Sequence, residues 1–203
     1  MLKVMIDLYT PQSCGIFLDG EKLINGFGEI GDNIILIPQD PELFNTTILE
    51  NITMGNEYPA GDVELVAELA CFSGVVQRLP NKYDSSIKER GVNLSGGEKQ
   101  RLALARGLLA CKDKHIVLLD EPTSSVDSRN ELAIYENIFR QYRNKTIISS
   151  IHRLHLLPLF DRIYYFENGK IVASGAFKEM MKYNKFNKMW KRYTASQKTK
   201  KEK

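Results

Sequence analysis

The chain has 203 residues, of which 43% are hydrophobic and 26% charged, as is usual for one globular domain with a sizeable core. These values exclude a disordered or collagen-like chain, and no stretch comes near the roughly 18 consecutive apolar residues of a membrane helix. Three widely spaced cysteines without a CxxC pair argue against a disulfide framework or a zinc site. No secretory signal is visible, so we expect a protein of the cytosolic side.

The net charge of +3 is unevenly distributed. Residues 178–203 contain 10 Lys or Arg against 2 Asp or Glu, whereas residues 1–177 contain 18 against 23. Nucleic-acid-binding domains usually carry a basic stripe on their folded face, so we expect no nucleic-acid partner. We predict a folded domain over residues 1–193 and a basic disordered tail over 194–203. Attraction of this tail to an anionic membrane is the alternative to simple solvation.

The predicted elements alternate between strands and helices. In chain order they are a short helix at 2–8, a strand at 15–18 that enters a tight turn at Asp19-Gly20, a buried strand at 34–37, helices at 62–78 and 95–109, a strand at 116–119, a helix at 131–142, a strand at 146–151, and a hairpin of 163–166 with 170–173. This alternation indicates an α/β fold around a largely parallel sheet, with a helical lobe at about 45–106.

Two glycine-containing segments match nucleotide-binding patterns only superficially. Residues 26–31 read GxGxxG, but they run into the strand at 34–37 rather than opening a helix that could bind a pyrophosphate. Gly169-Lys170 lacks the earlier glycine of a phosphate-binding loop and is followed by Ile171 in place of Ser or Thr. We therefore set both segments aside.

Two other segments carry the chemistry. In residues 94–101, LSGGEKQR, an N-capping Ser95 followed by two glycines would let a phosphate approach bare amides at a helix N-terminus. In residues 116–127, a buried strand ends in Asp120-Glu121, which places two carboxylates at the edge of the sheet where α/β proteins bind ligands. Mg²⁺ held through Asp120, with Glu121 polarising a water, would offset the repulsion between them. A capped surface helix and a solvated strand end are the plainer alternatives.

Together these segments resemble the ATP-binding domain of ABC transporters. Residues 94–101 look like the family signature, 116–121 like Walker B with its catalytic glutamate, 124–127 like the D-loop, 151–154 like the switch-histidine segment, and 37–40 like the Q-loop. Residues 43–52 and Glu89-Arg90-Gly91 have the form typical of exporter-type members. The resemblance covers residues 1–181, in order and with the expected spacing.

The resemblance implies a P-loop NTPase-like ABC ATPase fold with ATP and Mg²⁺ as cofactors. Glu121 would orient or deprotonate the attacking water, and His152 would contact the γ-phosphate. Gln39 would sense the γ-phosphate and would hold the metal together with Asp120. His115 and His155 match no role in the family, and we expect them to be structural.

The resemblance also implies partners. Ser95, Gly96 and Gly97 would bind the ATP of a second ABC domain in a head-to-tail dimer, with Asp127 as a further nucleotide-binding residue. A transmembrane domain would be contacted through the regions of Gln39 and 89–91. The expected location is therefore the cytoplasmic face of the cell membrane, within a membrane-bound transporter.

One departure from the family pattern bears on activity. The sequence has no GxxxxGK[ST] loop, and residues 2–8 look like the helix that follows this loop, so we expect the first strands and the P-loop to be missing. The leading hypothesis is an exporter motor domain, present here as a piece of a longer protein and weak or inactive as an ATPase alone. The alternatives are a catalytically incomplete half that lends its signature motif to a partner, and a soluble ABC ATPase of repair or translation. Residues 43–52 and 89–91 speak against the last.

Overall fold

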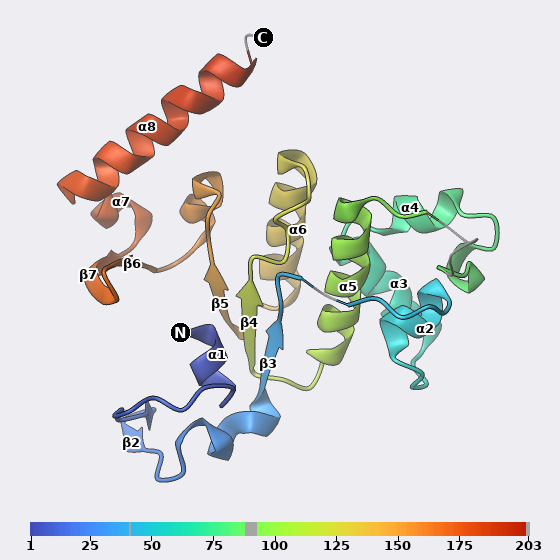
Figure 1. Ribbon diagram of the computed structural model, residues 1–203, viewed down its shortest axis with the longest axis horizontal. Coiled ribbons are helices and arrows are strands. Elements are labelled where there is room, and N and C mark those ends of the chain that lie inside the picture. Colours follow the sequence, from blue (N-terminus) through green and yellow to red (C-terminus); the bar gives the residue numbers. More distant parts are fainter. Residues whose placement is uncertain (41, 88–92, 202–203) are drawn as a thin grey trace. The chain divides into compact units, whose positions relative to one another are not determined.

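The computed structural model describes residues 1–40, 42–87 and 93–201, with side chains described as far as residue 197 (Figure 1). The contacts within the chain divide it into two compact units, Met1–Ser150 and Ile151–Lys203. The sequence pattern predicted a single domain, and it offered no linker by which to recognise this division.

A three-stranded parallel sheet forms the centre of the first unit. Its strands are β3 (Ile34–Ile37), β4 (Ile116–Asp120) and β5 (Thr146–Ser150), in the order β3-β4-β5. Pairing runs from Ile34 opposite Ile116 at one end to Asp120 opposite Ser150 at the other. The predicted aliphatic strands are confirmed. Because the strands are parallel, their carboxyl ends meet at one edge.

Helices cover this sheet. The helix α1 (Leu2–Met5) places Leu2 against Ile34 and Leu118. The long helix α5 (Gly96–Ala110) packs closely on β3 at Gly107, where a Cβ would lie 2.7 Å from the Ile37 side chain. Glycine is needed there because the helix axis could not otherwise come so near the strand. The helix α6 (Ser128–Gln141) contacts β5 through a hydrogen bond of 2.9 Å between Tyr135 and Ser149.

Short helices gather on one side of α5 (Figure 1). They are α2 (Ile48–Thr53), α3 (Ala60–Leu69), α4 (Ser73–Arg78) and the 3₁₀ turn η2 (Lys82–Asp84). The continuous helix predicted over 62–78 is wrong, because the chain breaks at Cys71, which takes a left-handed φ of 52°. This break lets Phe72 turn inward and become fully buried.

Two glycine-containing segments follow the sequence prediction. β1 (Phe17–Leu18) and β2 (Glu21–Lys22) pair through Asp19-Gly20, where both residues have positive φ, as a tight hairpin turn requires. The glycines at 26–31 lie in a 3₁₀ segment, η1 (Gly26–Asn33), that leads directly into β3. No α-helix begins at the GxGxxG sequence, as expected.

The second unit is a hairpin covered by helices. β6 (Ile163–Glu167) and β7 (Lys170–Gly175) are antiparallel, preceded by η3 (Leu154–Leu159) and followed by α7 (Phe177–Met180) and α8 (Asn184–Lys201). Its core contains Leu157, Ile163, Met180 and Phe186.

The helix α8 continues to Lys201, where we expected a disordered tail from residue 194. The domain boundary at residue 193 itself stays a prediction. In the part of the chain that the structure describes, no helical stretch combines the length and the apolar character that crossing a bilayer requires.

Candidate nucleotide site

Residues predicted to hold a metal lie at the carboxyl edge of the sheet. Asp120 ends β4, and its Oδ1 accepts a hydrogen bond of 2.8 Å from the hydroxyl of Ser150, the last residue of β5. Gln39 lies two residues after the end of β3, the strand that neighbours β4. The sequence analysis missed Ser150. Its only signal was its position at the end of a predicted strand parallel to β4.

Glu121 occupies a backbone conformation that costs energy. Its φ is 46°, in the left-handed region that non-glycine residues rarely adopt. The strand therefore ends abruptly, and the chain turns into the loop over 121–127 directly after Asp120. Strain of this kind persists where the surrounding structure fixes it, and it is typical of functional sites.

Ser95 caps α5 in a reciprocal arrangement. Its hydroxyl accepts from the Glu98 amide at 3.4 Å, and the Glu98 carboxylate accepts from the Ser95 amide at 2.9 Å. Arg78 on α4 also pairs with Glu98. Partial burial acts to raise the pKa of Glu98, but the hydrogen bonds from Ser95 and Arg78 outweigh it and the pKa is lowered. This end of α5 is thus held with Ser95 and Gly96 exposed, as anion binding at a helix N-terminus requires.

Gly97 has a packing role that the sequence did not reveal. A Cβ at this position would lie 2.7 Å from the backbone oxygen of Ser125, whereas at Gly96 the nearest atom would be 3.9 Å away. The first turn of α5 therefore contacts the backbone of the loop over 121–127. Gly97 makes this close approach possible.

Asp127 serves as the N-cap of α6. Its carboxylate accepts from the backbone amides of Arg129 and Asn130 at 3.1 and 3.0 Å, and from the Asn130 side chain at 2.6 Å. The hydrogen bonds from Asn130 contribute most to lowering the pKa of Asp127. This structural role is sufficient to explain the residue type, and the nucleotide-binding role stays a prediction.

A buried side chain joins three of the predicted motifs. Gln100, in the second turn of α5, donates from Nε2 to the Gln39 backbone oxygen at 3.1 Å and to Ser124 Oγ at 2.7 Å. Its Oε1 accepts from the Ser125 amide at 2.7 Å. The structure thus brings the segments of Gln39, the signature motif and the 121–127 loop together.

The other side of the loop is fixed to α6. The hydroxyl of Thr123 donates to Oε1 of Glu131 at 2.8 Å, and the Glu131 side chain is almost completely buried. A buried carboxylate needs such a partner, because its desolvation is costly. The loop is therefore held between α5 and α6.

Arg106 fixes the segment that follows Gln39. It donates to the Asn51 backbone oxygen at 2.6 Å, to Asn51 Oδ1 at 2.8 Å and to the Glu42 backbone oxygen at 2.7 Å. Its guanidinium also lies 5.0 Å from the ring centroid of Phe44. Burial lowers the pKa of Arg106, although a guanidinium remains charged at neutral pH. The other predicted contact region, Glu89-Arg90-Gly91, lies outside the described residues.

His152 belongs to the second unit and is exposed. His155 lies in the same unit, where its Nδ1 is 2.8 Å from the hydroxyl of Tyr193 and the two rings stack. This contact ties η3 to α8 and agrees with the structural role expected for His155. The catalytic role of His152 stays a prediction.

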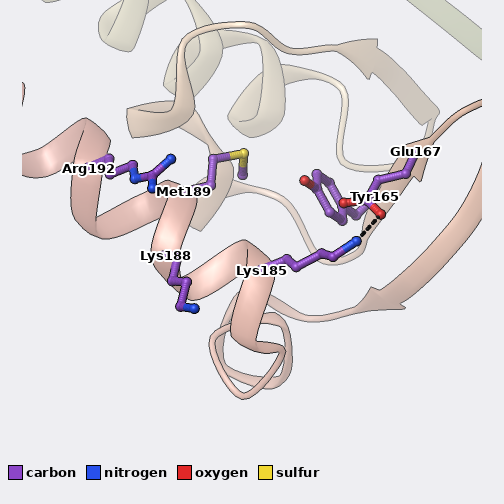
Figure 2. Close-up of a pocket in the computed structure, with 6 residues that line it drawn as sticks. All are labelled: Tyr165, Glu167, Lys185, Lys188, Met189 and Arg192. Atoms are coloured by element: carbon purple, nitrogen blue, oxygen red, sulfur yellow. Dashed lines mark hydrogen bonds and ion pairs between the residues drawn. The ribbon is translucent and has the colours of Figure 1, made fainter.

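A hollow of about 350 Å³ lies in the second unit beside α8 (Figure 2). It is lined by Tyr165, Glu167, Lys185, Lys188, Met189 and Arg192. Lys185 is paired with Glu167 at 2.7 Å, and Figure 2 shows the charged groups of Lys188 and Arg192 pointing in other directions. The positive groups that line this hollow therefore do not converge on one point (Figure 2).

The carboxylate at the sheet edge has the donor chemistry that Mg²⁺ prefers. No cluster of three His, Cys, Asp or Glu side chains suited to a metal occurs in the described residues. Mg²⁺ bound with a nucleotide, however, needs only one or two protein oxygen ligands beside phosphate and water. The Asp120 carboxylate, oriented by Ser150, would supply one such ligand.

Comparison with known structures defines the class of protein. The chain superposes on the structure of a bacterial Atm1-family ABC exporter with ATP bound, with a TM-score of 0.81 and 32% sequence identity, over 94% of this chain and 33% of that one. The fold is therefore that of a P-loop NTPase of the ABC ATPase type. Residues 1–124 match the ABC transporter family. The chain belongs to this family, as an ATP-binding domain of exporter type.

Two relatives illustrate the range of the family. The glutathione/L-cysteine transport system ATP-binding/permease protein CydD of Bacillus subtilis is 37% identical over 175 residues, which are 86% of this chain and 30% of the relative. The mitochondrial iron-sulfur clusters transporter ABCB7 of Danio rerio is 36% identical over 177 residues, 86% of this chain and 24% of the relative. The chain thus spans a third or less of the length of these proteins.

Proposed function

We propose that this chain is the ATP-hydrolysing motor of a membrane exporter, placed at the cytoplasmic face of the membrane. The observation that carries this proposal is the position of Asp120, oriented by Ser150, at the sheet edge next to Gln39 and the loop that starts at Glu121. The proposed cofactors are ATP and Mg²⁺, which would supply the γ-phosphoryl group and a neutralising cation.

The proposed reaction assigns each residue one task. Glu121 would orient the attacking water and accept its proton, which its place directly after the proposed metal ligand Asp120 supports. Gln39 would share the metal with Asp120, and His152 would donate a hydrogen bond to the γ-phosphate. Positioning and charge stabilisation account for most of the catalysis of phosphoryl transfer, so the rigid loop over 121–127 favours this assignment.

The proposed partners follow from the exposed end of α5. Ser95 and Gly96 are exposed and capped, with Gly97 packed behind them, and we infer that they meet the ATP of a second ABC domain. Asp127 would join them from the far end of the loop. The segment fixed by Arg106 would contact a transmembrane domain together with residues 89–91.

A second candidate function is that of a catalytically incomplete half that serves a partner's ATP site. The 203 residues contain no GxxxxGK[ST] sequence, so a phosphate cradle of that kind must come from outside them. We infer that these residues alone are a weak or inactive ATPase. The capped N-terminus of α5 with Ser95 and Gly96, by contrast, lies within these residues, so they could serve a partner's ATP site.

The test is ATP hydrolysis by the protein as its source cell makes it, compared with Glu121→Gln. The motor proposal expects wild-type turnover that depends on Mg²⁺ and falls at least 100-fold in the variant. The second function expects no turnover by this protein alone but stimulation of an intact ABC partner, abolished by Ser95→Arg. Turnover that is equal in wild type and Glu121→Gln would contradict the motor proposal.

A further inference from the structure

The side chain of Gln100 is a buried polar group that connects separate segments of the candidate site. It is 6% exposed, and its amide makes three hydrogen bonds, to the Gln39 carbonyl, the Ser124 hydroxyl and the Ser125 amide. An amide offers two N–H donors and one acceptor oxygen, so both ends of this group are engaged. A buried amide that lost these partners would be left with a large desolvation cost.

The three partners belong to two segments that are distant in sequence. Gln39 is 61 positions before Gln100, and Ser124 and Ser125 are 24 and 25 positions after it. Two of the bonded partner groups are backbone atoms, so two of the three bonds depend on where the segments lie and not on their side chains. Any movement of the Gln39 segment that keeps these bonds must displace either α5 or the loop.

The loop is fixed on both sides, so it cannot accommodate such a movement by shifting freely. Gly97 lies against the Ser125 carbonyl on the α5 side, and Thr123 is bonded to the buried Glu131 on the α6 side. Glu121 and Asp127 stand at the two ends of this loop. A displacement at Gln39 would therefore move Glu121, beside the proposed water, and Asp127, at the proposed dimer contact.

We propose that Gln100 is a positioning residue that holds the Gln39 segment and the 121–127 loop at fixed positions relative to each other and to α5. This inference rests on the function proposed above and adds a residue to it. In this role Gln100 would act through its protein partners and not by touching nucleotide or metal. It sets the position of Glu121 through Ser124 and Ser125, and it ties that position to the Gln39 segment.

The experiment uses Gln100→Met, which keeps the length and volume of the side chain and removes all three hydrogen bonds. Gln100→Glu retains an acceptor for the Ser125 amide but, when ionised, has no N–H for the Gln39 carbonyl. Gln77→Met, on the exposed face of α4, is the matched control. Each variant is made in the protein as its source cell produces it, and kcat and KM for MgATP are measured together with hydrogen exchange at the Ser125 amide.

We expect Gln100→Met to lower kcat at least tenfold, to change KM less than threefold and to speed exchange at Ser125 at least tenfold. Gln100→Glu should lower kcat similarly but leave exchange at Ser125 near its wild-type rate. The control should match the wild type in every measurement. If Gln100→Met proves too unstable to purify, Ser124→Ala removes one of the three bonds and should give a smaller fall in kcat.

The failure of this inference differs from failure of the proposed function. A wild type that hydrolyses ATP, with Gln100→Met within twofold of it in kcat, overturns the positioning role alone. A fall in kcat that matches a loss of folded protein in thermal unfolding overturns it as well, because a purely structural residue would give that result. A wild type no faster than Glu121→Gln instead overturns the motor function, and the exchange at Ser125 then decides the positioning role by itself.

Discussion

The hydroxyl of Ser150 donates a hydrogen bond of 2.8 Å to Oδ1 of Asp120, directly across the β4–β5 pair. The two residues end neighbouring parallel strands, so the bond lies at the edge of the sheet where ligands of α/β proteins bind. A hydroxyl in this place orients the carboxylate, and it would do so without a bound metal. Partners of this kind commonly contribute to metal affinity, although they do not touch the metal.

Removal of this hydroxyl should weaken the proposed metal site. We expect Ser150→Ala to raise the Mg²⁺ concentration needed for half-maximal ATP hydrolysis about tenfold or more, and to cost about 1 kcal/mol of stability. A titration of activity with Mg²⁺ checks the first value, and urea unfolding checks the second. Ser150→Thr, which keeps the hydroxyl, is the control. A Ser150→Ala protein with an unchanged Mg²⁺ dependence would show that Ser150 has no part in the site.

Because the backbone of Glu121 is left-handed, two substitutions of this residue should have the same effect on activity but different effects on stability. Glu121→Ala and Glu121→Gly both remove the carboxylate, so both should lose at least 100-fold in ATP turnover, about 3 kcal/mol of activation free energy. Glycine adopts a φ of 46° without steric cost, so Glu121→Gly should be more stable than Glu121→Ala by about 1 kcal/mol. Urea unfolding of the two variants provides the measurement. Equal stabilities would mean that the backbone at Glu121 is unstrained.

Local features of the fold could be predicted from the sequence because short-range chemistry determines them. The strand at 34–37 is a continuous aliphatic run, and Asn168-Gly169 has the residues that tolerate positive φ in a two-residue turn. The helix break at Cys71 could not be predicted, because neither glycine nor proline marks it. Burial of Phe72 in the tertiary structure decides that break.

The same distinction holds for the candidate site. Ser95 and Asp120 could be found from motif and position alone. Gln100 lies within the same motif, but its three partners are 24 to 61 residues away, and no periodicity reports such contacts. The sequence predicts that Gly97 lets a phosphate approach the backbone amides. Only the structure reveals its close contact with the Ser125 carbonyl.

That contact predicts unequal effects for two adjacent glycines. Gly97→Ala would bring a methyl group to 2.7 Å from the Ser125 oxygen, so α5 or the loop must shift, at a cost of about 1–3 kcal/mol. Gly96→Ala meets nothing closer than 3.9 Å and should be neutral, or stabilising by up to about 1 kcal/mol through helix propensity. Thermal or urea unfolding of both variants is the measurement. Similar stabilities would argue against close packing at Gly97.

The hydrogen bonds to Glu98 predict how stability depends on pH. Because they lower its pKa in the folded state, ionised Glu98 stabilises the fold above its ordinary value of 4.5, and this contribution is lost as the pH falls through the folded pKa. The stability difference between wild type and Glu98→Gln should therefore be constant from about pH 8 to about pH 5 and shrink in more acidic solution. Urea unfolding across this range is the measurement. In an Arg78→Met background the difference should be smaller above pH 5, because one of the stabilising partners is gone.

The bonds of Arg106 predict that a lysine cannot replace it. A guanidinium reaches the two oxygens of Asn51 and the Glu42 carbonyl at once, whereas one ammonium group cannot span the same planar set. We expect Arg106→Lys to cost about 2–4 kcal/mol and Arg106→Leu to cost more, since the three oxygens then lose every donor that Arg106 supplies.

A local measurement distinguishes this effect from general destabilisation. The Phe44 amide donates to Asn51 Oδ1 at 3.0 Å, and Arg106 holds that same oxygen in place. Exchange of the Phe44 amide should therefore accelerate in Arg106→Lys more than exchange in the central strand β4 does. Arg140→Lys, which changes an exposed arginine of α6, should stay within about 0.5 kcal/mol of the wild type. If Arg106→Lys is equally harmless, the segment after Gln39 is held by its own helix α2, and Arg106 does not position it.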